Sequence, residues 1–112
     1  MRAAAARTDA FRAIADPTRR AVLDLLRQSE RSVSELCEPF AMSQPALSQH
    51  LKVLRRAGLV TTRRAGRLRV YALDPRPLRA VSEWVAHYER FWDEKLDALG
   101  RYLDETAPKR KR

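Results

Sequence analysis

The spacing of apolar residues along the chain predicts several short helices in its first half. Residues 1–8 are expected to form a flexible N-terminus, and Phe11 indicates a short first helix after them. Asp16 and Pro17 predict the start of a second helix that reaches about residue 28, because Asp is a favoured N-cap and Pro is favoured at the first helical position.

Two further helices are predicted between residues 32 and 58. Ser32 and Glu35 fit a capping box, in which each side chain accepts a hydrogen bond from the other residue's backbone, and Pro39 should end this short helix. Ser43 is expected to cap the next helix, and Gly58 to end it in a left-handed conformation. The buried stripe of this helix is expected to comprise Leu47, Leu51 and Leu54.

Residues 59–73 predict two short strands that turn at Ala65 and Gly66. Because side chains alternate along a strand, we expect one face of the second strand to pack and the other to stay polar. The packing side chains should be Leu68, Val70 and Ala72. Two helices with a tight link followed by a hairpin predict a mainly α fold with a small β-hairpin, the winged helix-turn-helix.

One long helix is predicted after Asp74 and Pro75, which we expect to cap it. Its apolar residues recur with near-heptad spacing over about seven turns. They are Leu78, Val81, Val85, Tyr88, Trp92, Leu96, Leu99 and Leu103. Such an apolar stripe either packs in the chain's own small core or forms the seam of a dimer. We favour the dimer, because the remainder of the chain is too small to cover it.

The distribution of charge along the chain gives the first indication of function. The chain of 112 residues has a net charge of +9, of which residues 43–73 hold +7 without any Asp or Glu. A long window of one sign repels itself, and a polyanion is the usual partner that offsets this repulsion.

The helix of residues 44–56 places its polar side chains opposite its three leucines. Ser and Gln near its start suit hydrogen bonds to base edges, whereas basic residues further along suit phosphates. The candidate DNA-binding residues here are Ser43, Gln44, Pro45, Ser48, Gln49, His50, Lys52, Arg55 and Arg56. His50 is interpreted as a half-buried packing or phosphate-contacting residue rather than a metal ligand. An ordinary solvated helix face is the simpler alternative.

Four arginines surround the tip of the predicted hairpin, namely Arg63, Arg64, Arg67 and Arg69. They either protect an exposed strand edge against aggregation or form a wing that contacts the DNA backbone or minor groove. We favour the wing, since these residues continue the basic face of the preceding helix.

A family resemblance rests on four segments: Ala15–Arg20, Ser34–Cys37, Met42–Leu54 and Ala57–Val60. Over about residues 9–105 the chain resembles the ArsR (arsenical-resistance-type) family of bacterial winged-helix repressors. The resemblance implies a homodimer on a pseudo-palindromic operator, repressing transcription near its own promoter. It also implies that the first and last helices form the dimer interface, which would add Phe11 to the apolar stripe. We therefore expect residues 9–106 to form a DNA-binding domain with dimerisation helices at both ends, and residues 107–112 a disordered basic tail.

Metal-sensing members of that family often carry two Cys two residues apart on the helix before the DNA-reading helix. Here Cys37 is followed by Pro39 at the second position. The last helix has His87, and Arg90 stands three residues later in place of a carboxylate. We expect no metal site and no cofactor, and interpret Cys37 as a small buried hydrophobe rather than a sensor.

Two other function classes fit less well. An RNA-binding basic module would suit the charge, but the basic face lacks an aromatic stacking platform apart from Tyr71. An enzyme is not expected, since no nucleophile–base set or phosphate loop is visible. The absence of a membrane-spanning run, a signal peptide and a second Cys predicts a soluble intracellular protein. The family resemblance implies a bacterial, cytoplasmic protein that is associated with the nucleoid when it binds DNA.

Overall fold

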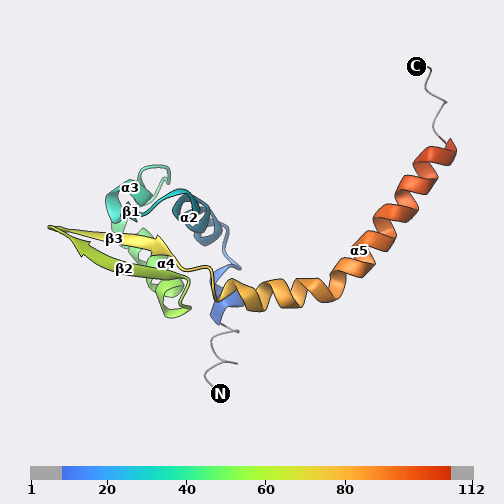
Figure 1. Ribbon diagram of the computed structural model, residues 1–112. Coiled ribbons are helices and arrows are strands. Elements are labelled where there is room, and N and C mark those ends of the chain that lie inside the picture. Colours follow the sequence, from blue (N-terminus) through green and yellow to red (C-terminus); the bar gives the residue numbers. More distant parts are fainter. Residues whose placement is uncertain (1–8, 107–112) are drawn as a thin grey trace. The chain divides into compact units, whose positions relative to one another are not determined.

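The computed structural model describes residues 9–106; the expected flexible N-terminus and basic tail lie outside this range. The chain divides into two units after Val81, and each is described by itself. In the first unit, residues 9–13 are helical. The elements that follow are α2 (Pro17–Gln28), β1 (Arg31–Ser32), α3 (Val33–Cys37), α4 (Gln44–Arg56), β2 (Val60–Ala65), β3 (Leu68–Leu73) and the start of α5 (Leu78–Thr106) (Figure 1).

The helix ends follow the capping residues that the sequence predicts. The Asp16 carboxylate accepts a hydrogen bond from the Arg19 backbone N–H at 3.0 Å. Ser32 and Glu35 form both halves of the capping box before α3. The Ser43 hydroxyl accepts from the Ala46 N–H at 3.3 Å and caps α4. Gly58 follows α4 with a φ of 75°, a left-handed conformation that glycine adopts without strain. These predictions are confirmed.

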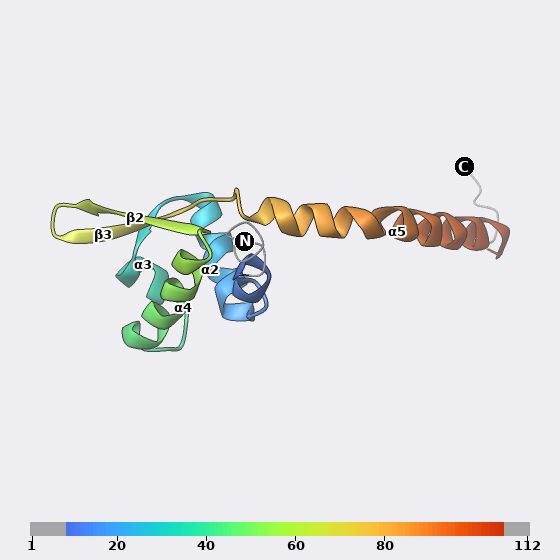
Figure 2. The same ribbon diagram turned by 90° about the horizontal axis from the view of Figure 1, so that it is seen from below.

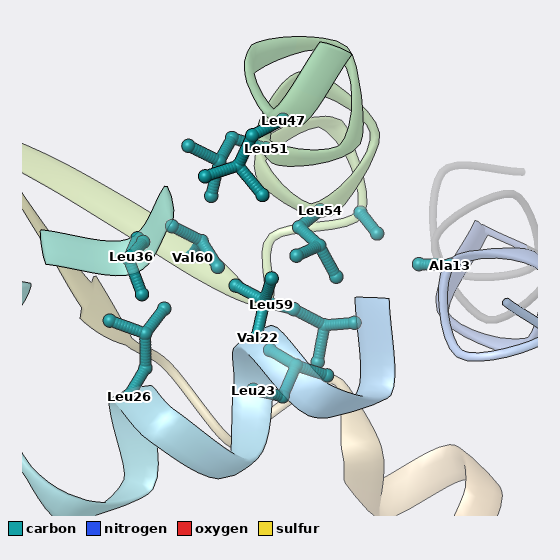
Figure 3. Close-up of a cluster of buried hydrophobic side chains, with 11 residues drawn as sticks. Ala13, Val22, Leu23, Leu26, Leu36, Leu47, Leu51, Leu54, Leu59 and Val60 are labelled. Carbon is teal, nitrogen blue, oxygen red and sulfur yellow. The ribbon is translucent and has the colours of Figure 1, made fainter. Parts of the chain in front are cut away.

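A small leucine-rich core holds α4 in place. Leu47, Leu51 and Leu54 are at most 1% exposed and face side chains from α2, α3 and β2 (Figure 3). The other buried members include Val22, Leu23, Leu26, Leu36, Leu59 and Val60. Removing one such leucine side chain costs about 2–5 kcal/mol. The buried side of α4 is therefore firmly fixed, which in turn fixes its polar side.

The sheet has three strands rather than the two predicted. β3 lies between β2 and β1 and pairs antiparallel with both, with Arg31 opposite Tyr71 in the short β1 ladder. A two-residue strand has too little pattern of its own to be recognised in a sequence.

The expectation about the packed face of β3 is wrong. Tyr71 and Leu73 pack against the core, whereas Leu68 is 56% exposed. The reason is the length of the hairpin, whose tip extends beyond the helices (Figures 1 and 2). Only the half of β3 near Leu73 lies over the core, and on that half the odd-numbered residues face inward.

Helix α5 begins at Leu78, three residues later than expected for a cap at Asp74 and Pro75. The Asp74 carboxylate instead accepts hydrogen bonds from the Arg76 backbone N–H at 3.1 Å and from its guanidinium Nε at 2.9 Å. The guanidinium of Arg76, together with this backbone N–H, holds the pKa of Asp74 below its usual value. This local pair forms a turn ahead of the helix, whose first N–H, from Leu78, reaches the Pro75 carbonyl.

The second unit is the continuation of α5 from residue 82. None of the residues of α5 is buried. Trp92 and Leu96, at the centre of the apolar stripe, are 59% and 61% exposed. None of the helices in residues 9–106 combines the length and apolar character that crossing a membrane would require.

Candidate nucleic-acid interface

The polar face of α4 is exposed as the sequence predicts. Its exposed members are Gln44, Pro45, Ser48, Gln49, Lys52, Arg55 and Arg56, and the capping residue Ser43 is exposed before them. This face lies opposite the three buried leucines and carries three positive charges and no negative one. It combines hydrogen-bonding side chains in the first two turns with cations in the last two.

The first turn of α4 is also tied to the preceding helix. The Gln44 side-chain amide donates to the Ser34 hydroxyl on α3 at 3.2 Å. The Ser43 hydroxyl and the Gln44 amide are thus both engaged within the protein. Ser48 and Gln49, one turn further along α4, are exposed and present hydrogen-bonding groups outward. They are therefore the strongest candidates for reading base edges.

His50 is half-buried, as expected, and its side chain contacts Arg19 of α2 and the N-cap residue Asp16. Its Nδ1 lies 3.3 Å from the Arg19 guanidinium and 3.9 Å from the Asp16 carboxylate. The Arg19 backbone N–H holds the pKa of Asp16 below its usual value. Sequence reasoning gave Arg19 no role, because the contact joins residues 31 positions apart.

The four arginines of the hairpin do not share one face. We use "wing" for β2, β3 and the turn between them. Arg64 pairs directly across the strands with Arg69, on the face that Val60 and Tyr71 identify as the core side. Arg63 lies on the opposite face and forms an ion pair with Glu30, which its Nε reaches at 3.2 Å. Arg67 is exposed in the turn at the tip.

The opposed pair Arg64 and Arg69 has a functional implication. Like charges directly opposite each other on a sheet destabilise it. Arg69 also lies 3.4 Å from the Thr62 hydroxyl, which cannot neutralise a charge. Both side chains are exposed and belong to the basic window of residues 43–73, which makes them candidates for contact with an anionic partner.

Cys37 is half-buried, and its thiol donates to the Met42 carbonyl at 3.3 Å. Residues 9–106 contain no group of three or more His, Cys, Asp or Glu side chains placed to hold a metal ion.

The candidate dimer residues fall into two groups. Leu78 packs against the core of the first unit, and Phe11 and Val81 are partly exposed. The rest of the apolar stripe, from Val85 to Leu103, is at least 40% exposed at each of its large hydrophobic residues.

Fold and surface together define a class. Helices α3 and α4 pack on one hydrophobic core, the exposed face of α4 is basic, and a basic β-hairpin follows. This arrangement is a winged helix-turn-helix of the DNA-binding type.

Comparison with known proteins identifies the family. Residues 16–62 match the family described as "Bacterial regulatory protein, arsR family". The chain is 43% identical over 95 residues to the HTH-type transcriptional regulator Rv2034 of Mycobacterium tuberculosis, covering 85% of this chain and 86% of that protein. It is 34% identical over 86 residues to the transcriptional repressor SdpR of Bacillus subtilis, covering 77% and 96%.

A solved structure agrees with these relatives. The crystal structure of the ArsR family transcriptional regulator RHA00566 matches with a TM-score of 0.68 and 40% identity, over 77% of this chain and 89% of that one. The chain belongs to the ArsR family of DNA-binding transcriptional regulators, as the resemblance in its sequence implied.

Proposed function

We propose that this protein is a homodimeric, sequence-specific repressor that places α4 of each subunit in the DNA major groove of a pseudo-palindromic operator. The observation that carries the proposal is the fixed polar face of α4. Three leucines that are at most 1% exposed hold one side of the helix, so that Ser48 and Gln49 project from the other.

In this proposal, the N-terminal half of α4 contacts bases and the C-terminal half contacts phosphates. Gln49 can donate and accept at an adenine edge, and Ser48 suits either a donor or an acceptor. Lys52, Arg55 and Arg56 follow toward the C-terminal half, where phosphates of the flanking backbone are the expected partners. The wing adds Arg64 and Arg69 as further phosphate contacts.

Dimerisation is proposed through the exposed apolar stripe of α5, with Phe11 from the first helix. Large aromatic and aliphatic side chains at the centre of such a surface dominate interface energy, which assigns that role to Trp92 and Leu96. A single α4 covers only a few base pairs, so two copies on one DNA face are needed for useful specificity.

Repression near its own promoter, in the bacterial cytoplasm, completes the proposal. SdpR, at 34% identity, is named a transcriptional repressor, which supports this direction of control.

A mobility-shift assay on DNA upstream of the protein's own gene, paired with a promoter reporter, tests the function. The wild type should shift this DNA ahead of a shuffled sequence and lower reporter output, and Gln49→Ala should weaken both effects. Reporter output that rises with the protein would refute repression. Equal binding to shuffled DNA would refute sequence specificity.

A further inference from the structure

One arginine side chain connects three parts of the first unit. The Arg19 guanidinium donates from Nε to the Ala13 carbonyl at 2.7 Å and from Nη2 to the Arg12 carbonyl at 3.1 Å. Its remaining nitrogen, Nη1, lies 3.3 Å from His50 Nδ1 on α4. The planar fork therefore reaches two backbone carbonyls at the end of the first helix and one side chain on the DNA-reading helix.

We propose that Arg19 is a positioning residue for DNA recognition: through His50 it sets the rotation of α4 and couples it to the first helix. This inference rests on the proposed function, in which α4 reads bases and the first helix joins the dimer. Arg19 would then carry the geometry of the dimer end of the subunit to the reading face.

The hydrogen-bonding chemistry of arginine determines which atom is the acceptor in the contact with His50. A guanidinium has five donors and no acceptor, so it hydrogen-bonds Nδ1 only when that nitrogen carries a lone pair. His50 Nδ1 is then the acceptor of this hydrogen bond. The Asp16 carboxylate, 3.9 Å away, is beyond hydrogen-bond reach.

The base of the Arg19 side chain is itself immobilised. Its backbone N–H binds the Asp16 carboxylate at the N-cap of α2, and Val22 and Leu23 anchor the same helix in the core. The fork therefore extends from a fixed helix rather than from a loop, which suits it to transmit position.

A small rotation of α4 would matter for recognition. Side chains lie roughly 5–6 Å from a helix axis, so a turn of about 10° moves them by about 1 Å. Hydrogen bonds to base edges tolerate less than that. His50 directly follows Gln49, so a contact that fixes the rotation of α4 at His50 also fixes the direction in which the Gln49 side chain leaves the helix.

Arg20 supplies a matched control. It is the next residue of α2, carries the same charge, and its Nη1 donates to the Ile14 carbonyl at 2.8 Å, directly after the Ala13 carbonyl that Arg19 binds. Within residues 9–106, the Arg20 guanidinium makes no hydrogen bond to α4.

The test compares Arg19→Lys with Arg20→Lys in the 112-residue chain. Both variants keep the charge, but an ammonium lacks the fork that reaches three acceptors at once. We expect Arg19→Lys to lose about tenfold in operator affinity, the effect of one misplaced base contact, with unchanged affinity for random DNA. Arg20→Lys should bind as the wild type does.

Two further measurements keep the inference falsifiable. Nitrogen NMR of the His50 ring should show Nδ1 as acceptor in the wild type and in Arg20→Lys, and a changed signature in Arg19→Lys. Adding His50→Ala to Arg19→Lys should cause no further loss of operator affinity, because both changes break one contact.

Several results would overturn the inference. Wild-type operator affinity in Arg19→Lys would show that charge alone suffices, as for a phosphate contact. An additive loss in the double variant would show that His50 acts independently of Arg19. If Arg19→Lys melts at a lower temperature and loses random-DNA binding equally, the residue acts on stability. Absence of operator binding by the wild type would instead refute the proposed function.

Discussion

Replacing both Arg64 and Arg69 with Gln tests which face of the wing contacts DNA. The two residues are directly opposed across β2 and β3, on the same face as Tyr71. If each arginine binds one phosphate, the double variant releases about two fewer counterions on binding.

The size of the effect follows from the salt dependence of phosphate contacts. Each contact contributes about −0.9 to the slope of log affinity against log salt, so the double variant should flatten the slope by about 1.8. A fourfold rise in salt should therefore weaken the wild-type complex about tenfold more than the variant complex. The free protein should not lose stability, because the substitution removes two opposed like charges.

Fluorescence anisotropy across a salt series measures the slope, and calorimetry of the free protein measures the melting temperature. Arg63→Gln is the control for Arg64→Gln, because Arg63 has the same charge on the same strand but faces away and pairs with Glu30. We expect Arg63→Gln to change the slope by much less than Arg64→Gln. Equal slopes for the two single variants, or an unchanged slope in the double variant, would refute the assignment of the DNA-facing side.

Four other outcomes are expected. Gln49→Ala should weaken operator binding by about 1–3 kcal/mol and leave random-DNA binding intact, as measured by competition assays; equal losses would contradict base reading. Leu96→Glu should give monomer or aggregate by light scattering and abolish operator binding, although every DNA-facing residue remains. Micromolar zinc should not release bound DNA; zinc-induced release that disappears in Cys37→Ala would contradict this. Stability should fall as pH drops below about 4, because cap hydrogen bonds hold the pKa values of Asp16 and Glu35 below their usual ones. These depressed folded-state values stabilise the fold above the unfolded-state pKa and lose that effect as each carboxyl protonates, which acid titration by circular dichroism would detect.

The helical part of the fold could be predicted because its signals are local. A cap such as Ser43 and a stop such as Gly58 act within a few residues of the helix they bound. The packed face of β3 could not be predicted in the same way. It depends on where the helices end along the hairpin, and alternation alone gives two faces without saying which one meets the core at Tyr71.

The candidate site likewise has some features that could be predicted from the sequence and others that could not. Exposure of Ser48 and Gln49 followed from helical geometry once the leucines were placed. The contacts that distinguish the arginines are long-range. Arg63 pairs with Glu30, which lies 33 positions away, and Arg19 reaches His50 across 31 positions. Neither contact could be predicted from the spacing of residues within one helix or strand.

The central claim is that two copies of this chain read one DNA site with two-fold symmetry. Selection of bound sequences from a randomised DNA library, followed by the mass of the complex on the selected site, tests it most directly. The account predicts an enriched pseudo-palindrome whose half-sites are about 10–10.5 base pairs apart, or a multiple of that, with two chains per duplex. An asymmetric motif bound by one chain, or no enrichment over random DNA, would contradict it.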